Sequence, residues 1–303
     1  IGVLLLSVGS PETKEDVEEY LYNVFCDPEI LTLPPAFSWA LKQPIAAFIA
    51  KTEAPAAREI MESVGGLSPQ KATIDQQALA LKQELANRGV SSKLYVAMRY
   101  WTPFADEAVE QMKADGIQKL VILPLYPQFS LSTSGSSLRV LERMLYTDPG
   151  FPMESTVVPA WYNRRGFLRA TARAVAEALA ALPDGGEGAH VLYSAQGLPR
   201  VYVEELGDPY EEQVRRTVEL VTAQLAELGH APKNTLSFQG QFGPQRVAWL
   251  GPSTSEVIGQ LDPATDYAAL TEAGKQALLT GPIAGKPAEL DRGAIKTFAV
   301  ARD

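Results

Sequence analysis

Apolar stretches and amphipathic stretches alternate along the chain. The first stretch, IGVLLLSVGSPE, holds an unbroken apolar run before a Gly/Ser/Pro turn, and such a run predicts a strand of a parallel sheet that is covered on both faces. Residues 92–101 and 117–128 have the same character. Between them, residues 103–116 have the spacing of an amphipathic helix that Gly116 ends. This order predicts a βαβ unit.

A second set of elements repeats the alternation. Strands are predicted over residues 153–161, 188–197 and 234–244, and helices over 164–183 and 208–229. The chain therefore has the pattern of an α/β protein with two doubly wound domains.

We expect these domains to contain parallel sheets and to span residues 1–150 and 151–303, joined near 147–155. Ligands of doubly wound folds bind outside the carboxyl ends of the strands. The residues directly after each predicted strand are therefore the candidates for a functional site.

Two segments interrupt the alternation. Residues 33–51 mix prolines with large aromatic and aliphatic side chains. A lip or membrane-facing surface and an ordinary packed helical loop are both open interpretations of this segment. Residues 263–303 are rich in Ala, Gly and Pro, and their pattern predicts no element clearly.

Composition narrows the classes of function. The formal net charge of −9 and a pI near 5.0 argue against a nucleic-acid partner, because phosphate neutralisation needs clustered Lys and Arg. The single cysteine, Cys26, allows no intrachain disulfide and fits a reducing compartment. Two histidines and one cysteine nearly exclude a metal site of several imidazole or thiolate ligands. Because Ile1 rather than Met comes first, a targeting peptide could lie outside this sequence.

Several strand-end motifs resemble those of the ferrochelatases, the enzymes that insert ferrous iron into protoporphyrin IX. The cyanobacterial and plant members are the most similar. The resemblance covers roughly residues 1–260 and implies two flavodoxin-like, or chelatase-like, halves with a porphyrin cleft between them. The motifs, in family order, are GVLLLSVGSPE, YLYNVFCDPEILTLP, VAMRYWTPF, LVILPLYPQFSLSTSGSSL, YSAQGLP, EELGDPYEEQV and WLGPSTSEVI.

The resemblance implies porphyrin-binding roles for residues just past predicted strands. Arg99 would bind a propionate carboxylate through its guanidinium group, and an ion pair that holds a loop is the structural alternative. Trp161, read from the pattern alone, is a core residue. The residues implied to line the porphyrin side, besides Arg99, are Tyr100, Tyr126, Gln128, Ser130, Ser132, Trp161 and Tyr210.

Two of these motifs also have a local structural interpretation. The run PLYPQFSLSTSGSSL predicts a turn and a hydroxyl-rich helix start, whose N–H and hydroxyl groups would form an anion cradle and a cap. In GDPY, Asp208 is the expected cap and Pro209 the expected first helical residue.

Four polar positions depart from the family pattern. Gln196 stands where the resemblance places a catalytic His, and an amide neither accepts a proton nor binds metal usefully. Glu289 is a doubtful counterpart of the family's acidic residue, since the adjacent His is missing and the tail is shortened or divergent. Gln241 replaces an Arg, and Ser7 replaces an Asn. Loss of an acid–base pair costs several orders of magnitude in rate.

These departures favour a ferrochelatase-like protein that has lost most or all metal insertion and is kept as a structural subunit or porphyrin-binding protein. The alternative is an active ferrochelatase in which Glu204, Glu205 or Asp208 relays protons through water. A different chelatase is less favoured, because His190 precedes a predicted strand and His230 lies in a turn. A nicotinamide-binding domain is least favoured, because no Gly-x-Gly-x-x-Gly follows the first strand.

The expected ligands and location follow from this hypothesis. No cofactor or resident metal is required, and protoporphyrin IX or haem is the expected ligand. The expected partners are a larger protein assembly and a membrane surface that residues 33–51 contact, without nucleic acid. We expect an organelle, mitochondrion or plastid, with membrane association, and a bacterial cytoplasm as the alternative.

Overall fold

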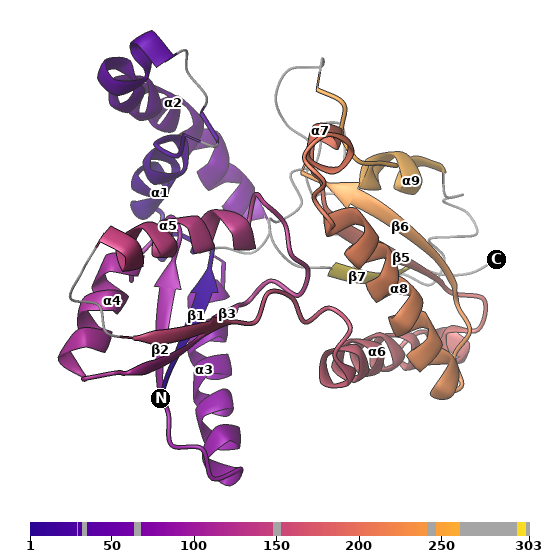
Figure 1. Cartoon of the computed structure of the whole chain (residues 1–303). Coiled ribbons are helices and arrows are strands. Elements are labelled where there is room, and N and C mark those ends of the chain that lie inside the picture. Colours follow the sequence, from indigo (N-terminus) through magenta and orange to yellow (C-terminus); the bar gives the residue numbers. More distant parts are fainter. Residues whose placement is uncertain are drawn as a thin grey trace. The chain divides into compact units, whose positions relative to one another are not determined.

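The chain folds into two compact units, Ile1–Ala160 and Trp161–Asp303 (Figure 1). The structure, a computed structural model, describes residues 1–28, 30–31, 35–63, 68–147, 153–240, 247–260 and 296–300. Each unit packs helices against a sheet of parallel strands, and the second unit adds one antiparallel strand. The predicted α/β class is therefore confirmed.

The first unit contains a parallel four-stranded sheet in the order β2-β1-β3-β4. All six residues of β1 are buried, as its unbroken apolar run predicts. Leu4 of β1 lies opposite Tyr95 of β2 and Ile122 of β3. The strands are β1 (Gly2–Ser7), β2 (Lys93–Met98), β3 (Lys119–Pro124) and β4 (Glu154–Val157).

Helices cover both faces of this sheet. One face packs against α4 (Ala105–Ala114) and α5 (Ser134–Thr147), and the other against α1 (Asp16–Phe25), α2 (Pro35–Ser63) and α3 (Gln70–Asn87). Crossovers leave β1 and β3 in opposite directions along the sheet, and right-handed connections therefore place their helices on opposite faces. The carboxyl ends of β1 and β3 thus form the topological switch point, where doubly wound folds bind ligands.

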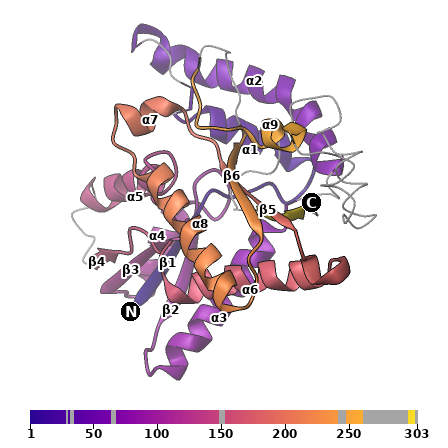
Figure 2. The same cartoon turned by 90° about the vertical axis from the view of Figure 1, so that its right-hand side faces the viewer.

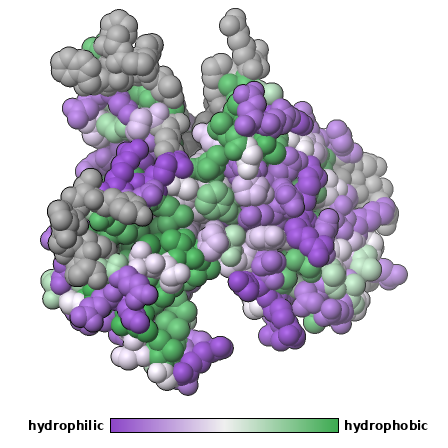
Figure 3. Space-filling view, in the orientation of Figure 1, coloured by the Kyte–Doolittle hydropathy of each residue, from purple (hydrophilic) through white to green (hydrophobic). Residues whose placement is uncertain are grey.

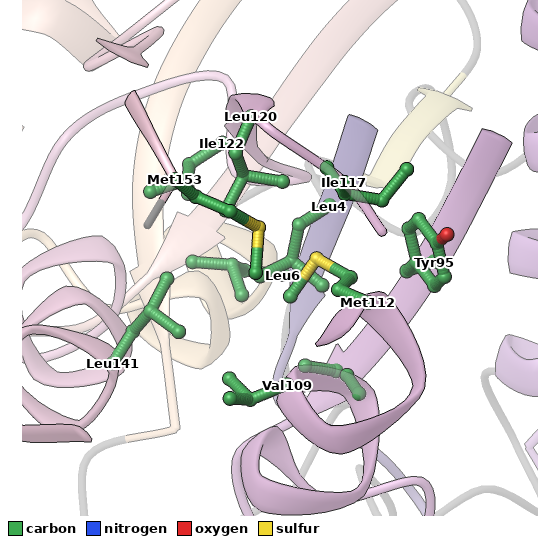
Figure 4. Close-up of a cluster of buried hydrophobic side chains, with 12 residues drawn as sticks. Leu4, Leu6, Tyr95, Val109, Met112, Ile117, Leu120, Ile122, Leu141 and Met153 are labelled. Atoms are coloured by element: carbon green, nitrogen blue, oxygen red, sulfur yellow. The ribbon is translucent and has the colours of Figure 1, made fainter. Parts of the chain in front are cut away.

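Figure 4 shows the apolar core between the sheet and the α4–α5 layer. Leu4 and Leu6 project from the same face of β1, because side chains two residues apart share a face. They meet Met112 of α4, Ile122 of β3 and Leu141 of α5, all of them buried. This cluster holds the strand ends that carry the candidate site.

A long helix, α2, contains two prolines, Pro44 and Pro55. Each proline removes a backbone donor and favours a kink, yet packing against α1 keeps the segment helical. The buried alanines of α2 are spaced every four residues, so that they share one face. They are Ala46, Ala50 and Ala54.

The described part of residues 33–51, from Pro35 onward, is therefore helical, as one interpretation predicted. Leu41 and Phe48 are 44% and 70% exposed on it. None of the helices in the described ranges is long and apolar enough to cross a membrane. Contact of this segment with a membrane surface stays a prediction.

One strand, β4, belongs to the first unit, although the sequence pattern predicts it in the second set of elements. The segment 153–161 was assigned to the second set of elements, but β4 pairs in parallel with β3 and completes the first sheet. The right-handed crossover through α5 returns the chain beside β3. All four residues of β4 are exposed, so apolar patterning alone could not assign it.

The second unit has the strand order β6-β5-β7. β5 (His190–Gln196) and β6 (Lys233–Gln239) are parallel, and β7 (Lys296–Val300) is antiparallel to β5. Side chains of Val191 and Tyr193 project from one face of β5 onto α6 and α8. Figure 2 shows these two helices beside β5 and β6.

The helices of this unit follow the predicted pattern closely. The predicted ranges 164–183 and 208–229 correspond to α6 and α8, each with an apolar stripe at helical spacing. Three short elements were not predicted. The elements are α6 (Arg165–Ala180), the 3-10 helix η1 (Pro183–Gly186), α7 (Arg200–Glu204), α8 (Tyr210–Glu227) and α9 (Thr254–Gln260).

Candidate functional site

The segment after β2 is fixed to the segment after β1 by backbone hydrogen bonds. The Arg99 N–H donates to the Ser7 carbonyl at 2.8 Å, and the Tyr100 N–H donates to the Val8 carbonyl at 2.9 Å. Pairing of the two chains therefore continues past the ends of the strands. This places Arg99 and Tyr100 rigidly at the carboxyl edge of the first sheet.

Arg99 forms a buried ion pair with Asp27, which follows the end of α1. The Arg99 Nη2 lies 2.6 Å from Asp27 Oδ2, and the Asp27 side chain is 1% exposed. The Tyr100 hydroxyl donates to the same oxygen at 2.7 Å. Arg99 Nε also donates to Ser136 Oγ of α5 at 3.0 Å. One carboxylate thus joins α1 to the end of β2, and Arg99 extends the connection to α5.

Burial raises the pKa of the Tyr100 hydroxyl, and the neighbouring Asp27 carboxylate raises it further. Deprotonation would place a second negative charge beside Asp27 in a medium of low dielectric constant. The Arg99 guanidinium carbon lies 4.9 Å from the Tyr100 ring centroid, in a cation–π contact. Tyr100 therefore stays protonated at neutral pH and acts as a hydrogen-bond donor.

Hydroxyl groups of the loop after β3 form hydrogen bonds within the loop. Ser130 Oγ and Ser132 Oγ are 2.9 Å apart, and the Ser130 carbonyl accepts the Gly135 N–H at 2.9 Å. Gln128 and Ser130 are 6% and 1% exposed. The predicted helix start is confirmed by α5, which begins at Ser134. A porphyrin role for these residues stays a prediction.

Three buried hydroxyls near the start of α5, those of Tyr126, Ser134 and Ser137, make no hydrogen bond of good geometry within the residues that the structure describes. The Tyr126 and Ser137 hydroxyls lie close enough to interact with each other. Burial raises the pKa of Tyr126, and the nearby Ser137 hydroxyl offsets the rise only in part. An unmade hydrogen bond in a buried place costs free energy. These groups therefore mark a place that could accept polar atoms from outside the chain.

In the second unit, Gln196 and Tyr210 meet at the carboxyl end of β5. Gln196 ends the strand and is half-buried, and the adjacent Gly197 N–H donates to the Gln239 carbonyl of β6. Burial raises the pKa of Tyr210, the Gln196 backbone lowers it through a hydrogen bond, and the Asp208 carboxylate raises it. Tyr210 is therefore a neutral hydroxyl beside the Gln196 backbone, not a base.

Asp208 stabilises the start of α8. Its Oδ1 accepts the Tyr210 N–H at 3.0 Å, and the side chain is buried. Asp208 thus accepts a hydrogen bond from the helix start, but the N-cap is Pro209 and α8 begins at Tyr210, each one residue later than predicted. This hydrogen bond holds the Asp208 carboxylate in the turn before α8.

Buried hydroxyl groups form a hydrogen-bond network at β5, the strand that ends at Gln196. Thr254 Oγ1 of α9 lies 2.7 Å from Ser194 Oγ of β5 and 2.9 Å from Ser237 Oγ of β6. Ser194 Oγ also donates to Gln239 Oε1 at 3.1 Å. The network ties both strands and α9 together two residues before Gln196.

We expect Thr254→Val, which keeps the side-chain shape, to lower the free energy of unfolding by about 1–2 kcal/mol, because two buried hydroxyls each lose a partner. The measurement is urea unfolding followed by circular dichroism. Ser255→Ala, at the exposed neighbouring position, is the control and should change stability by less than about 0.5 kcal/mol. Equal effects of the two substitutions would contradict this role of the network.

The remaining predicted residues are not gathered at these strand ends. The Trp161 ring packs edge-on against Phe167 at 5.1 Å between centroids. Glu204 pairs with Arg200 at 3.0 Å on an exposed face of α7. Glu289 and Gln241 lie outside the described residues.

The two histidines are remote from Gln196 in the fold. His190 begins β5, six residues before Gln196, and its Nε2 lies 2.9 Å from Thr235 Oγ1. His230 follows α8 in a turn. In the described ranges, no three His, Cys, Asp or Glu side chains gather into a metal-binding group.

The sequence did not identify Asp27 as a site residue. It lies 72 positions before Arg99, and no local pattern reports such a contact. Its place in the motif YLYNVFCDPEILTLP was the only available signal, because an Asp-Pro pair at a helix end is a common turn. Ser136 and Thr254 were missed for the same reason.

Comparison with known proteins places this fold and these strand ends in context. The ferrochelatase family model matches residues 1–270. The ferrochelatase of Synechococcus elongatus is 47% identical over 263 residues, which are 86% of this chain and 65% of that protein. The ferrochelatase of Gloeobacter violaceus is 44% identical over 262 residues, 86% of this chain and 77% of that protein. Ferrochelatase-2, chloroplastic, of Arabidopsis thaliana is 46% identical over 262 residues, 86% of this chain and 50% of that protein.

The chain spans about half the length of the plant relatives that it matches. The match nevertheless covers both units, and it includes the Arg99 segment, the hydroxyl-rich loop and the Gln196 strand. The chain belongs to the ferrochelatase family.

Proposed function

We propose that this chain is a ferrochelatase-derived protein with lost or greatly reduced metal insertion, retained as a structural subunit or a porphyrin-binding protein. The observation that carries the proposal is Gln196 at the carboxyl end of β5. This is the strand end at which ligands bind in a doubly wound fold.

Metal insertion into a porphyrin requires that two pyrrole N–H groups lose their protons while a dehydrated metal ion is delivered. A neutral imidazole can accept a proton and can bind the metal. The Gln196 amide can only donate or accept hydrogen bonds. The neighbouring Tyr210 hydroxyl has a raised pKa and holds its own proton, so it offers no replacement base.

The second candidate is an active ferrochelatase that inserts Fe²⁺ into protoporphyrin IX in haem biosynthesis. The identity of 44–47% to proteins named ferrochelatase favours it. Its proton path would have to use the acidic residues after Gln196. Glu204 is already paired with Arg200, and Asp208 accepts a backbone N–H, which makes this path the weaker proposal.

The relatives support a location, and the partners are part of the proposal. The plant relatives are named chloroplastic, and others come from cyanobacteria, which supports a plastid or a bacterial location. A role as a subunit of a larger assembly, and contact of residues 33–51 with a membrane surface, are part of the same proposal. No resident cofactor is required, and protoporphyrin IX or haem is the proposed ligand, with Arg99 as its carboxylate partner.

The test is metal insertion by the full chain with protoporphyrin IX and Zn²⁺ or anaerobic Fe²⁺, followed by absorbance. We expect an initial rate about a hundred-fold or more below that of the Synechococcus elongatus relative, since one general base is worth roughly 10²–10⁴-fold. Gln196→His should raise the rate of this chain. A rate for the unaltered chain within about tenfold of the relative would refute the loss of activity and favour the second candidate.

Porphyrin binding measured without metal distinguishes a porphyrin-binding protein from a structural subunit. Titration of the chain with protoporphyrin IX, followed by porphyrin fluorescence, should saturate if the chain binds porphyrin. Absence of a saturable response would favour a structural subunit. Native mass spectrometry of the endogenous protein should then show it in a complex, and a lone monomer would contradict that role.

A further inference from the structure

A pocket of about 240 Å³ lies in the first unit, between α4 and α5 at the carboxyl ends of β1 and β2. We call it the α4–α5 pocket. Its floor is apolar and consists of Leu6, Ala97 and Met98. Figure 3 shows hydrophobic residues on the viewer's face of the first unit, in the area that α5 and the sheet occupy in Figure 1. The pocket is therefore a feature of one unit, and its geometry depends on that unit alone.

The polar groups of the pocket favour a negative charge. The Arg99 guanidinium lines it, and so does Ser137, whose buried Oγ lies near the Tyr126 hydroxyl and makes no hydrogen bond of good geometry within the described chain. Phe104 and Ala105 bring the amino-terminal end of α4 to the same wall. The orphan N–H groups and the dipole at a helix amino terminus attract anions. Two acidic residues of the first turn oppose this: Asp106, which lines the pocket, and Glu107, whose Oε2 accepts the Phe104 N–H. Both are exposed to solvent, which screens their charges.

The rest of the wall is apolar and elongated. Ser137, Val140 and Met144 share one face of α5, because they are three and four residues apart. With a rise of 1.5 Å per residue, this face extends about 10 Å from the hydroxyl to the thioether. The methionine of this face, Met144, is flexible and adapts to irregular apolar shapes.

The pocket therefore has an anion-binding end and an apolar end. Its volume corresponds to roughly eight liquid waters, which is too small for a tetrapyrrole and lies below the approximate lower limit for drug-sized ligands. The Tyr126 hydroxyl can donate to Ser137 Oγ, which leaves the Ser137 proton for an acceptor in the pocket. The Arg99 guanidinium favours a carboxylate as that acceptor. Once the carboxylate is placed, an apolar body of about six or seven carbon atoms would fill the remaining volume.

We propose that the α4–α5 pocket binds a small monocarboxylic acid with an apolar body, its carboxylate at Arg99 and Ser137 and its body along Val140 and Met144. The ligand is distinct from the porphyrin of the proposed function. Both proposals place a carboxylate at Arg99, but no porphyrin or metal enters the test below, so the outcome for the pocket is read separately from that for metal insertion.

The test is calorimetric titration of the full chain with sodium octanoate, and with octanol and inorganic phosphate as single-feature controls. Octanoate should bind one to one with micromolar to low millimolar affinity. Octanol and phosphate should each bind at least about tenfold more weakly, because each lacks one half of the recognition. Failure of octanoate to saturate at millimolar concentration would overturn the proposal, and so would equal binding of octanol.

Variants locate the ligand. Val140→Phe fills the pocket and should abolish octanoate binding, while Glu142→Phe, at an exposed position of the same helix, adds the same ring outside it and should change affinity less than about twofold. Ser137→Ala should weaken binding about tenfold, the value of a hydrogen bond to a charged group. Circular dichroism checks folding. If Val140→Phe does not fold, Ala105→Leu narrows the pocket from α4. Unchanged octanoate binding by the folded filling variant would refute the site.

Discussion

Replacement of Asp27 by alanine is expected to lower the free energy of unfolding of the first unit by about 3–5 kcal/mol, the cost of leaving one member of a buried ion pair without its partner. The Arg99 side chain is 19% exposed and would lose the carboxylate 2.6 Å away. The Tyr100 hydroxyl would lose its acceptor at the same time. Few single substitutions outside the apolar core combine these two losses.

The measurement is urea unfolding, together with hydrogen exchange of the peptides that contain β1 and β2. Exchange reports on the first unit separately, because the two units can unfold in separate steps. Asp75→Ala is the matched control. Asp75 pairs with Lys71 but is 57% exposed, and such a surface pair contributes less than about 1 kcal/mol. A loss below about 1 kcal/mol for Asp27→Ala would mean that Arg99 finds solvent or another partner at little cost.

The consequence for ligand binding is separate from stability. Arg99 holds the Asp27 carboxylate, so a propionate or another carboxylate would share the guanidinium with it. The guanidinium has five N–H donors, of which Asp27 and Ser136 use the Nη2 and Nε sides. The ion pair therefore orients Arg99 for a second anion. The two interpretations of Arg99 from the sequence, a contact with a ligand carboxylate and an ion pair that holds a loop, are thus compatible with one geometry.

The strands and helices of the first βαβ unit could be predicted closely because local signals and tertiary packing agree there. The unbroken apolar run of residues 2–6 became the fully buried β1. Gly116, with φ of +65°, follows the end of α4 as predicted, since only glycine adopts this conformation without strain. An element can be predicted from sequence where its local conformational preferences agree with the packing of the whole fold.

Elements whose placement depends on distant contacts could not be predicted. The exposed strand β4 gives no apolar pattern, and only its pairing with β3 assigns it to the first sheet. The prolines of α2 suggest an interrupted segment, yet the alanine face packed on α1 keeps one helix. Propensity is a weak prior that tertiary packing overrides.

The residues of the candidate site also form two groups, those that the sequence indicates and those that only distant contacts place. Residues that follow strands, such as Arg99 and Gln196, were found because position after a strand is visible in sequence. Asp27 lies 72 positions from its partner Arg99, and Thr254 lies 60 positions from its partner Ser194 on the strand that ends at Gln196, so their roles emerge only from the fold. Unpaired hydroxyls such as Ser137 are likewise invisible in sequence, since whether a polar group is satisfied depends on its three-dimensional neighbours.

The second large effect is expected at Gly9, in the loop after β1. Gly9 has φ of +87°, and an added Cβ would lie 2.9 Å from the Trp101 Cβ and 3.1 Å from the Met98 Cβ. Gly9→Ala should therefore lower the free energy of unfolding by about 2–4 kcal/mol, from left-handed strain together with overpacking. Urea unfolding and hydrogen exchange of the β1 and β2 peptides measure it.

Gly89→Ala separates the two causes. Gly89 has φ of +76°, but nothing lies within 4 Å of its added Cβ, so only the left-handed strain of about 1–2 kcal/mol should appear. The difference between the two variants then isolates the contact with Trp101 and Met98. Because Trp101 directly follows Arg99 and Tyr100, relief of this contact by movement of Trp101 would displace the Asp27 ion pair. A loss at Gly9 no larger than at Gly89 would show that the loop yields without strain, and that the carboxyl edge of the first sheet is less rigid than its hydrogen bonds indicate.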